Sequence, residues 1–155
     1  MNPTTILVAE DNREDAFLLE RAVRRAQVRA ALKFTTDGQE AVDYLAGTGG
    51  YANRLQHPFP TLMLLDLKMP RLDGFDVLDW IHRQPFVKRL PVIVMTSSQM
   101  AGDVNRAYDL GANSFVVKPM HLEGLDELIK GLKEFWLKLN RYPNCEAGND
   151  QGHSD

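Results

Sequence analysis

The chain has 155 residues, about the size of one domain. Its 18 Lys and Arg residues against 21 Asp and Glu give a formal charge of −3, without the basic excess typical of proteins that bind nucleic-acid backbones. A single cysteine excludes an internal disulfide, and no signal-peptide pattern or apolar run of ~20 residues is present. We therefore expect a cytoplasmic protein that binds neither nucleic acid nor membrane.

Short apolar runs typical of strands alternate with longer amphipathic stretches typical of helices. An insertion rich in Gly and Pro interrupts the alternation over 48–60, and a polar tail that we expect to be flexible covers 140–155. In chain order we predict strand 5–10, helix 13–26, strand 32–36, helix 38–46, strand 62–67, helix 74–84, strand 92–96, helix 100–110, strand 114–117 and helix 122–139.

Five strand–helix units in succession favour an α/β fold. Nearly continuous apolar strands such as 62–67 suit a parallel sheet that helices cover on both faces. Right-handed crossovers leave few topologies, and the common five-stranded one is the doubly wound, flavodoxin-like order 2-1-3-4-5. We assign this domain to residues 4–139.

Polar residues gather where the predicted strands end. The first strand ends at Glu10 and Asp11, the third carries Asp66, the fourth ends at Thr96, and the fifth is followed by Lys118. In the order 2-1-3-4-5 these positions surround the crevice at which such sheets bind ligands. Carboxylates with open positions suit Mg²⁺, and the whole set suits phosphoryl transfer to an aspartate nucleophile.

Four motifs carry a resemblance to a known family. They are VAEDN (8–12), LLDLKMPRLDG (64–74), VIVMTS (92–97) and GANSFVVKP (111–119). In this order they resemble the receiver domain of two-component response regulators, over residues 4 to 139. The insertion and the Phe135–Trp136 pair in a long last helix look like the small stand-alone regulators paired with bacterial phytochromes.

The resemblance implies a phosphorelay function, in which a sensor histidine kinase, for this sub-group a phytochrome, phosphorylates the domain. Mg²⁺ or Mn²⁺ would be the cofactor. The implied site residues are the phosphoacceptor Asp66, the metal ligands Asp11, Asp66, Lys68 through its backbone carbonyl and Glu10 through water, the phosphoryl-binding Thr96 and Lys118, the switch residues Thr96 and Phe115, and Pro119 after a cis peptide bond.

The resemblance also implies an output. Phosphorylation would repack the face made by the fourth helix, the fifth strand and the fifth helix. The sixteen residues after Leu139 are too few for a DNA-binding module, so we expect output through an unknown partner protein. Adjacent helix positions face about 100° apart, so one of Phe135 and Trp136 can stay exposed, and we predict a homodimer through this helix.

Other interpretations stay open at this point. The domain could be a phosphatase of the haloacid-dehalogenase type, although Lys68 stands where that family has a second acid, or a receiver-like scaffold that works without phosphorylation. Under the leading interpretation it is no enzyme beyond its own phosphorylation and dephosphorylation. Lys118 could be a structural ion pair, Phe115 could be plain core, and the arginines between 21 and 29 could be a solvated helix face or part of a kinase-docking surface.

Overall fold

A computed structural model describes residues 4–145 and shows a five-stranded parallel sheet in the order β2-β1-β3-β4-β5. This order is the predicted one, so the fold class is confirmed. The strands are β1 (Thr4–Ala9), β2 (Ala30–Thr35), β3 (Leu62–Leu65), β4 (Val92–Thr96) and β5 (Ser114–Val117).

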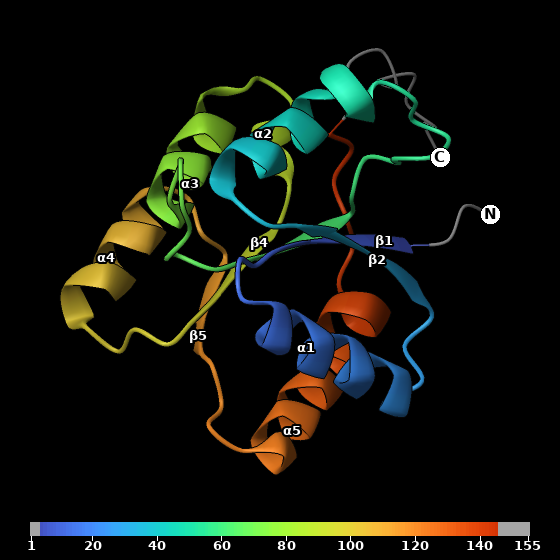
Figure 1. The fold of residues 1–155 in the computed structure, drawn as a ribbon, viewed down its shortest axis with the longest axis vertical. Helices are drawn as coiled ribbons and strands as arrows, with labels where there is room; N and C mark the ends of the chain where they lie inside the picture. Colours follow the sequence, from blue (N-terminus) through green and yellow to red (C-terminus); the bar gives the residue numbers. More distant parts are fainter. Residues whose placement is uncertain (1–3, 146–155) are drawn as a thin grey trace.

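Helices cover both faces of the sheet, with α1 and α5 side by side on one face and α2, α3 and α4 on the other (Figure 1). The apolar stripes read from the sequence are the faces that these helices bury. The helices are α1 (Arg13–Arg25), α2 (Gly38–Ala46), α3 (Gly74–Arg83), α4 (Ala101–Asp109) and α5 (Leu122–Leu132), with short 3-10 turns at η1 (Gly49–Tyr51) and η2 (Val87–Arg89).

Alternate residues of each central strand enter two separate cores. In β1, Ile6 and Val8 pack beneath α1 and α5, whereas Leu7 and Ala9 pack beneath α2 and α3. All four residues of β3 are buried. A strand covered on both faces has to be apolar throughout, which explains the continuous run in the sequence.

Side-chain caps fix where the helices after β1, β2 and β3 begin. Asn12 accepts a hydrogen bond from Asp15 N at 3.0 Å, and Asp37 accepts one from Glu40 N at 2.7 Å. Asp73 and Asp76 form a reciprocal capping box at the start of α3. These caps satisfy N–H groups that the helix itself cannot pair, so each loop after a strand has a defined length.

The 48–60 insertion packs on α2. The guanidinium group of Arg54 donates hydrogen bonds to the carbonyls of Tyr44 (2.7 Å), Leu45 (2.9 Å) and His57 (3.2 Å). The ring of Tyr51 lies 4.9 Å from that of Tyr44, centroid to centroid. The insertion thus supplies hydrogen-bond donors to the last carbonyls of α2, which a helix end otherwise leaves unpaired.

The last helix departs from the predicted single α-helix over 122–139. The α-helix ends at Leu132 and continues as a π-helix, η3 (Lys133–Leu139), closed by a 2.7 Å hydrogen bond from Asn140 N to Phe135 O. Trp136 and Leu137 then pack against the core beneath α1 and α5. The spacing of apolar residues in the sequence does not show this change from α-helical to π-helical (i→i+5) hydrogen bonds.

Residues 140–145, the described part of the predicted tail, contact the domain. Tyr142 packs against the core on the α1 and α5 side, and Cys145 packs against the core on the other side. The carbonyl of Asn144 accepts a hydrogen bond from Arg89 at 3.1 Å. The remainder of the predicted tail lies outside the described residues. Between residues 4 and 145, no helix is long and apolar enough to cross a membrane.

Candidate functional site

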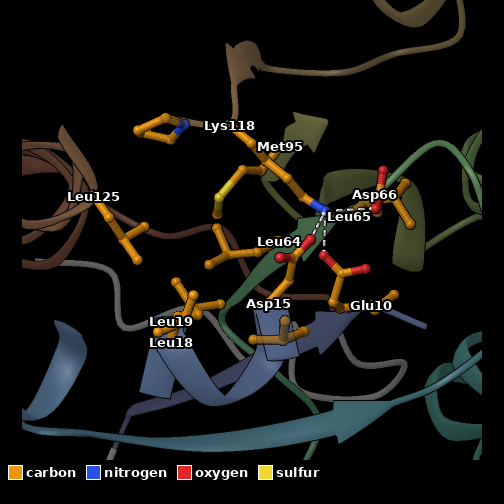
Figure 2. Close-up of a pocket in the computed structure, with 13 residues that line it drawn as sticks. Glu10, Asp15, Leu18, Leu19, Leu64, Leu65, Asp66, Met95, Lys118 and Leu125 are labelled. Carbon is orange, nitrogen blue, oxygen red and sulfur yellow. Dashed lines mark hydrogen bonds and ion pairs between the residues drawn. The ribbon is translucent and has the colours of Figure 1, made fainter. Parts of the chain in front are cut away.

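Lys118 stands at the centre of a cluster of three carboxylates (Figure 2). Its Nζ lies 2.8 Å from Asp66 Oδ2 and 3.0 Å from Asp15 Oδ2, and it also donates a hydrogen bond to Glu10 Oε1. The structure therefore brings together Glu10, Asp66 and Lys118, as the sequence predicted. It adds Asp15, which the sequence analysis did not single out.

Backbone hydrogen bonds that continue past the strands hold these residues in place. Asp66 N donates to Ala9 O at 3.1 Å, just beyond β3. Lys118 N donates to Thr96 O at 2.8 Å, just beyond β5. Because the carboxyl ends of parallel strands meet at one edge, the functional side chains start from a rigid frame.

Burial sets the electrostatics of the cluster. Glu10 and Asp66 are each only 7% exposed, and a buried carboxylate needs a partner. Burial raises the pKa of Glu10 to about 7, and the neighbouring Asp66 charge adds to this, while the hydrogen bond from Lys118 opposes it. Burial lowers the pKa of Lys118, but its hydrogen bonds with Asp66, Glu10 and Asp15 outweigh this and raise the pKa above its ordinary value. Lys118 is therefore a fixed positive charge.

Three carboxylates face one another closely enough to share a cation. One oxygen each from Glu10, Asp11 and Asp66 lies within 4.8 Å of the other two. Asp11 is exposed, whereas the other two are buried, so the group is open on one side. Clustered oxygen donors with an open side are what a hard divalent cation requires. The donor set therefore fits a divalent metal, and Lys68 lies beside it, its backbone N–H 3.3 Å from Asp66 Oδ1.

The expected switch residues occupy two different environments. Thr96 ends β4 fully buried, and its hydroxyl oxygen accepts a 3.4 Å hydrogen bond from Ser98 N. Ser98 in turn donates to Asp103 of α4 at 2.5 Å. Phe115 in β5 is partly buried and packs against the core beneath α2, α3 and α4. Two hydrogen bonds through Ser98 thus link Thr96 to Asp103 of α4.

One expectation about this site is wrong. The sequence resemblance implied a cis peptide bond before Pro119, but the described part of the chain contains no cis peptide bond. The Lys118–Pro119 bond is therefore trans, the isomer that X–Pro bonds favour by about 0.5–1 kcal/mol. With this trans bond, Lys118 still reaches Glu10, Asp15 and Asp66.

Asp15 was missed because its role depends on the direction of α1. In the sequence it is one of two acids in the first helical turn, the ordinary place for acids that favour the helix dipole. No helical spacing links it to the acids at the end of β1, because α1 begins at Arg13 and Asp11 precedes the Asn12 cap. The sequence alone does not show that this face turns towards Lys118.

Two further predicted features lie away from the cluster. The Phe135 side chain is 52% exposed, whereas Trp136 is partly buried against the core, so the pair divides as the helix geometry predicted. In the basic stretch of α1, Arg24 pairs with Glu20 at 3.0 Å, and Arg25 pairs with Asp126 of α5 at 2.8 Å. These surface pairs favour a solvated helix face for the arginines.

A doubly wound parallel sheet with buried acids and a lysine at its switch point defines a receiver-like α/β domain. The family model for the response regulator receiver domain matches residues 6–130, and the chain belongs to this family.

Several response regulators and their solved structures are similar to this chain over most of its length. Response regulator Rcp1 of Synechocystis is 35% identical over 91% of this chain and 94% of its own. The solved structure of its Mn²⁺-bound form matches with a TM-score of 0.83, covering 91% of this chain and 99% of that one. The phosphorylated cyanobacterial phytochrome response regulator RcpA matches with a TM-score of 0.85 at 36% identity, covering 92% and 100%. A probable methanogenesis regulatory protein, FilR2 of Methanothrix harundinacea, is 37% identical over 92% of this chain and 89% of its own.

These findings confirm the family that the sequence motifs indicated. The chain is a receiver-domain response regulator of a two-component system, and its relatives include stand-alone phytochrome response regulators. Membership of this family implies a sensor kinase as partner and phosphorylation as the switch. The acidic cluster, together with the Mn²⁺-bound relative, supports divalent metal binding.

Proposed function

We propose that Asp66 accepts the phosphoryl group from a histidine of the sensor kinase. The observation that carries this assignment is the ion pair of the buried Asp66 with Lys118, next to the carboxylate oxygens of Glu10 and Asp11, which lie within 4.8 Å of an Asp66 oxygen. A carboxylate in this setting is fixed in position, and the ammonium group of Lys118 stabilises negative charge added to it. The neighbouring acids Asp73, which is half-buried, and Asp76, which is exposed, cap α3 instead.

The transfer balances without a further reactant. An Asp66 carboxylate oxygen attacks the phosphorus, the phosphorus–nitrogen bond of the donor histidine breaks, and the nitrogen keeps the electron pair. Lys118 offsets charge on the phosphoryl oxygens. Dephosphorylation is the attack of water on the same phosphorus, with the Asp66 carboxylate as leaving group. The protein thus catalyses only its own phosphorylation and dephosphorylation.

The metal we propose is Mg²⁺, with Mn²⁺ as a substitute. Asp11, Asp66 and the backbone carbonyl of Lys68 would hold it directly, and Glu10 would hold it through water. When bound, such a cation neutralises the oxygens that gather around the phosphorus. The 4.8 Å grouping of the carboxylate oxygens supports this assignment, because without a cation or a proton the acids repel one another.

For the output, we propose that Thr96 moves its hydroxyl to a phosphoryl oxygen and that Phe115 follows it inward. The full burial of Thr96 and the link from Ser98 to Asp103 of α4 support a connection from this hydroxyl to α4. A phosphoryl group that makes this contact in only one of two states shifts the population towards that state. The α4-β5-α5 face, where Tyr108 and Val117 are exposed, would then bind the downstream protein.

The sensor kinase we propose is a phytochrome, by similarity to the phytochrome response regulators named above. The single cysteine of the chain still favours the reducing cytoplasm as its location. We also propose a homodimer through α5 and η3, supported by the exposure of Phe135 (52%) and Leu139 (68%). Sedimentation at tens of micromolar protein, with and without a phosphoryl mimic, tests the dimer, and a monomer mass under both conditions would exclude it.

Incubation with Mg²⁺ and acetyl phosphate tests the acceptor. The wild-type protein should gain the mass of one phosphoryl group, and Asp66→Asn should gain none. Asp79→Asn is the matched control, since Asp79 is an exposed acid that pairs with Arg83 on the surface of α3. Phosphorylation of Asp66→Asn to the wild-type extent would refute the assignment.

A further inference from the structure

Asp15 differs from the other two carboxylates that hold Lys118. Glu10 and Asp66 follow strands and are buried, with side chains 6% and 9% exposed, whereas the Asp15 side chain on α1 is 42% exposed. Its Oδ2 lies 3.0 Å from Lys118 Nζ. Lys118 is therefore tied to a helix as well as to the strand ends.

The start of α1 fixes Asp15. Asn12 caps the helix by accepting a hydrogen bond from Asp15 N at 3.0 Å, and Asn12 N donates to Glu10 Oε2 at 3.2 Å. The cap thus connects the backbone of Asp15 to the acid pair at the end of β1. A short side chain on a fixed backbone has few positions available, and this one meets Lys118.

Asp15 is also outside the group of carboxylates that face a common point. Glu10, Asp11 and Asp66 present oxygens within 4.8 Å of one another, and Asp15 is not among them. A divalent cation on that group competes with Lys118 for Glu10 and Asp66. It does not compete in the same way for Asp15, which remains a counter-charge for the ammonium group.

A small cavity gives Lys118 room on this side. It measures about 70 Å³ and lies between α1 and α5 (Figure 2). Asp15 and Lys118 border it together with apolar side chains that include Leu18, Leu19, Met95 and Leu125. The apolar stem of a lysine can lie against such a wall while its ammonium group stays with a carboxylate.

We propose that Asp15 is a positioning residue that keeps Lys118 beside the acceptor site when Glu10 and Asp66 hold a cation. This inference rests on the proposed metal and phosphorylation site. It assigns to α1 a direct part in placing the phosphoryl-binding lysine. Without the Asp15 charge, Lys118 has only Glu10 and Asp66 as carboxylate partners in the metal-free protein, so an incoming cation has to displace it from both. Once the cation is bound, Lys118 has no carboxylate partner of its own.

Asp15→Asn tests the proposal, with Glu14→Gln as the matched control. Both variants remove one negative charge from the first turn of α1, but Glu14 is exposed there. The cap that fixes this turn uses the backbone N–H of Asp15 and not its side chain, so Asp15→Asn should fold. Asp15→Glu, which keeps the charge, serves as the rescue variant.

The first readout is the Mg²⁺ dissociation constant from calorimetry. We expect it to rise about three- to tenfold in Asp15→Asn and less than about twofold in Glu14→Gln, because only the former alters a contact with Lys118. Asp15→Glu should restore most of the affinity. Equal changes in Asp15→Asn and Glu14→Gln would show a general effect of charge and would overturn the proposal.

The second readout is hydrogen exchange of the Lys118 ammonium group, measured by NMR at saturating Mg²⁺. The exchange should be several-fold faster in Asp15→Asn than in the wild-type protein, and unchanged in Glu14→Gln. An unchanged rate in Asp15→Asn would overturn the proposal. If the wild-type protein binds no Mg²⁺, the proposed metal site itself fails, and that outcome is distinct from a failure of the role of Asp15.

Discussion

Replacing Lys118 with methionine should destabilise the protein and at the same time strengthen its metal binding. Methionine keeps an unbranched apolar stem but removes the charge that Glu10, Asp15 and Asp66 share. Two carboxylates that are each 7% exposed would then lie side by side without a cation. A bound divalent metal would relieve that repulsion.

The structure sets the size of the effect. Removing one partner of a fully buried ion pair costs about 3–5 kcal/mol. Here the Lys118 side chain is 20% exposed and that of Asp15 is 42% exposed, so solvent screens part of the interaction. Glu10, with a pKa of about 7, can also take up a proton near neutral pH and relieve part of the repulsion. We therefore expect a loss of about 2–3 kcal/mol in the free energy of unfolding at pH 7.5.

Urea unfolding of both proteins, with and without Mg²⁺, measures this loss. Mg²⁺ should stabilise Lys118→Met more than it stabilises the wild-type protein, because a ligand that binds more tightly shifts the unfolding equilibrium further. Wild-type stability in the variant without metal would show that the carboxylates do not depend on Lys118. Weaker Mg²⁺ binding in the variant would show that lysine and cation do not compete, and would refute the reasoning.

Three more predictions concern the loop after β3 and the insertion. Gly38→Ala should lower the free energy of unfolding in urea by about 2 kcal/mol, because a Cβ at Gly38 would lie 2.0 Å from Leu72 O; unchanged stability would contradict that packing. Tyr51→Phe removes a 2.6 Å hydrogen bond to Glu40 and should cost about 1 kcal/mol at pH 7. Burial raises the pKa of Glu40, but hydrogen bonds from Tyr51 and Thr36 outweigh burial and lower the pKa below its ordinary value of 4.5. The stability that the Tyr51 hydrogen bond adds is therefore present above pH 4.5 and is lost as the pH falls through the lowered pKa. The free energies of unfolding of the wild-type protein and Tyr51→Phe should thus converge in acid. Lys68→Ala should change the half-life of the phosphoryl group more than the yield at saturating donor, and an unchanged dephosphorylation rate would exclude a role for this side chain.

The sheet and most of the site could be predicted because they depend on local patterns. A strand buried on both faces must be apolar along its length, and ligand-binding residues of such sheets follow the strand ends. These two rules predict from the sequence that Glu10, Asp66 and Lys118 lie in one crevice.

Other features depend on packing between distant segments, which one sequence does not encode as a pattern. The contact of Asp15 with Lys118 requires the orientation of α1 over the sheet. The π-helical end of the last helix, η3, requires the docking of Trp136 and Leu137, and the path of residues 140–145 requires both cores to be in place. A cis peptide bond before Pro119 was expected from family resemblance alone, but the bond is trans.

The most direct test of the central claim is chemical location of the phosphoryl group. Reduction of the phosphorylated protein with borohydride converts an acyl phosphate of aspartate to homoserine, and peptide mapping then locates that residue. We expect homoserine at position 66 and at no other acid of the crevice. Homoserine at position 11 or 15, or none at all in protein that carries a phosphoryl group, would contradict the account.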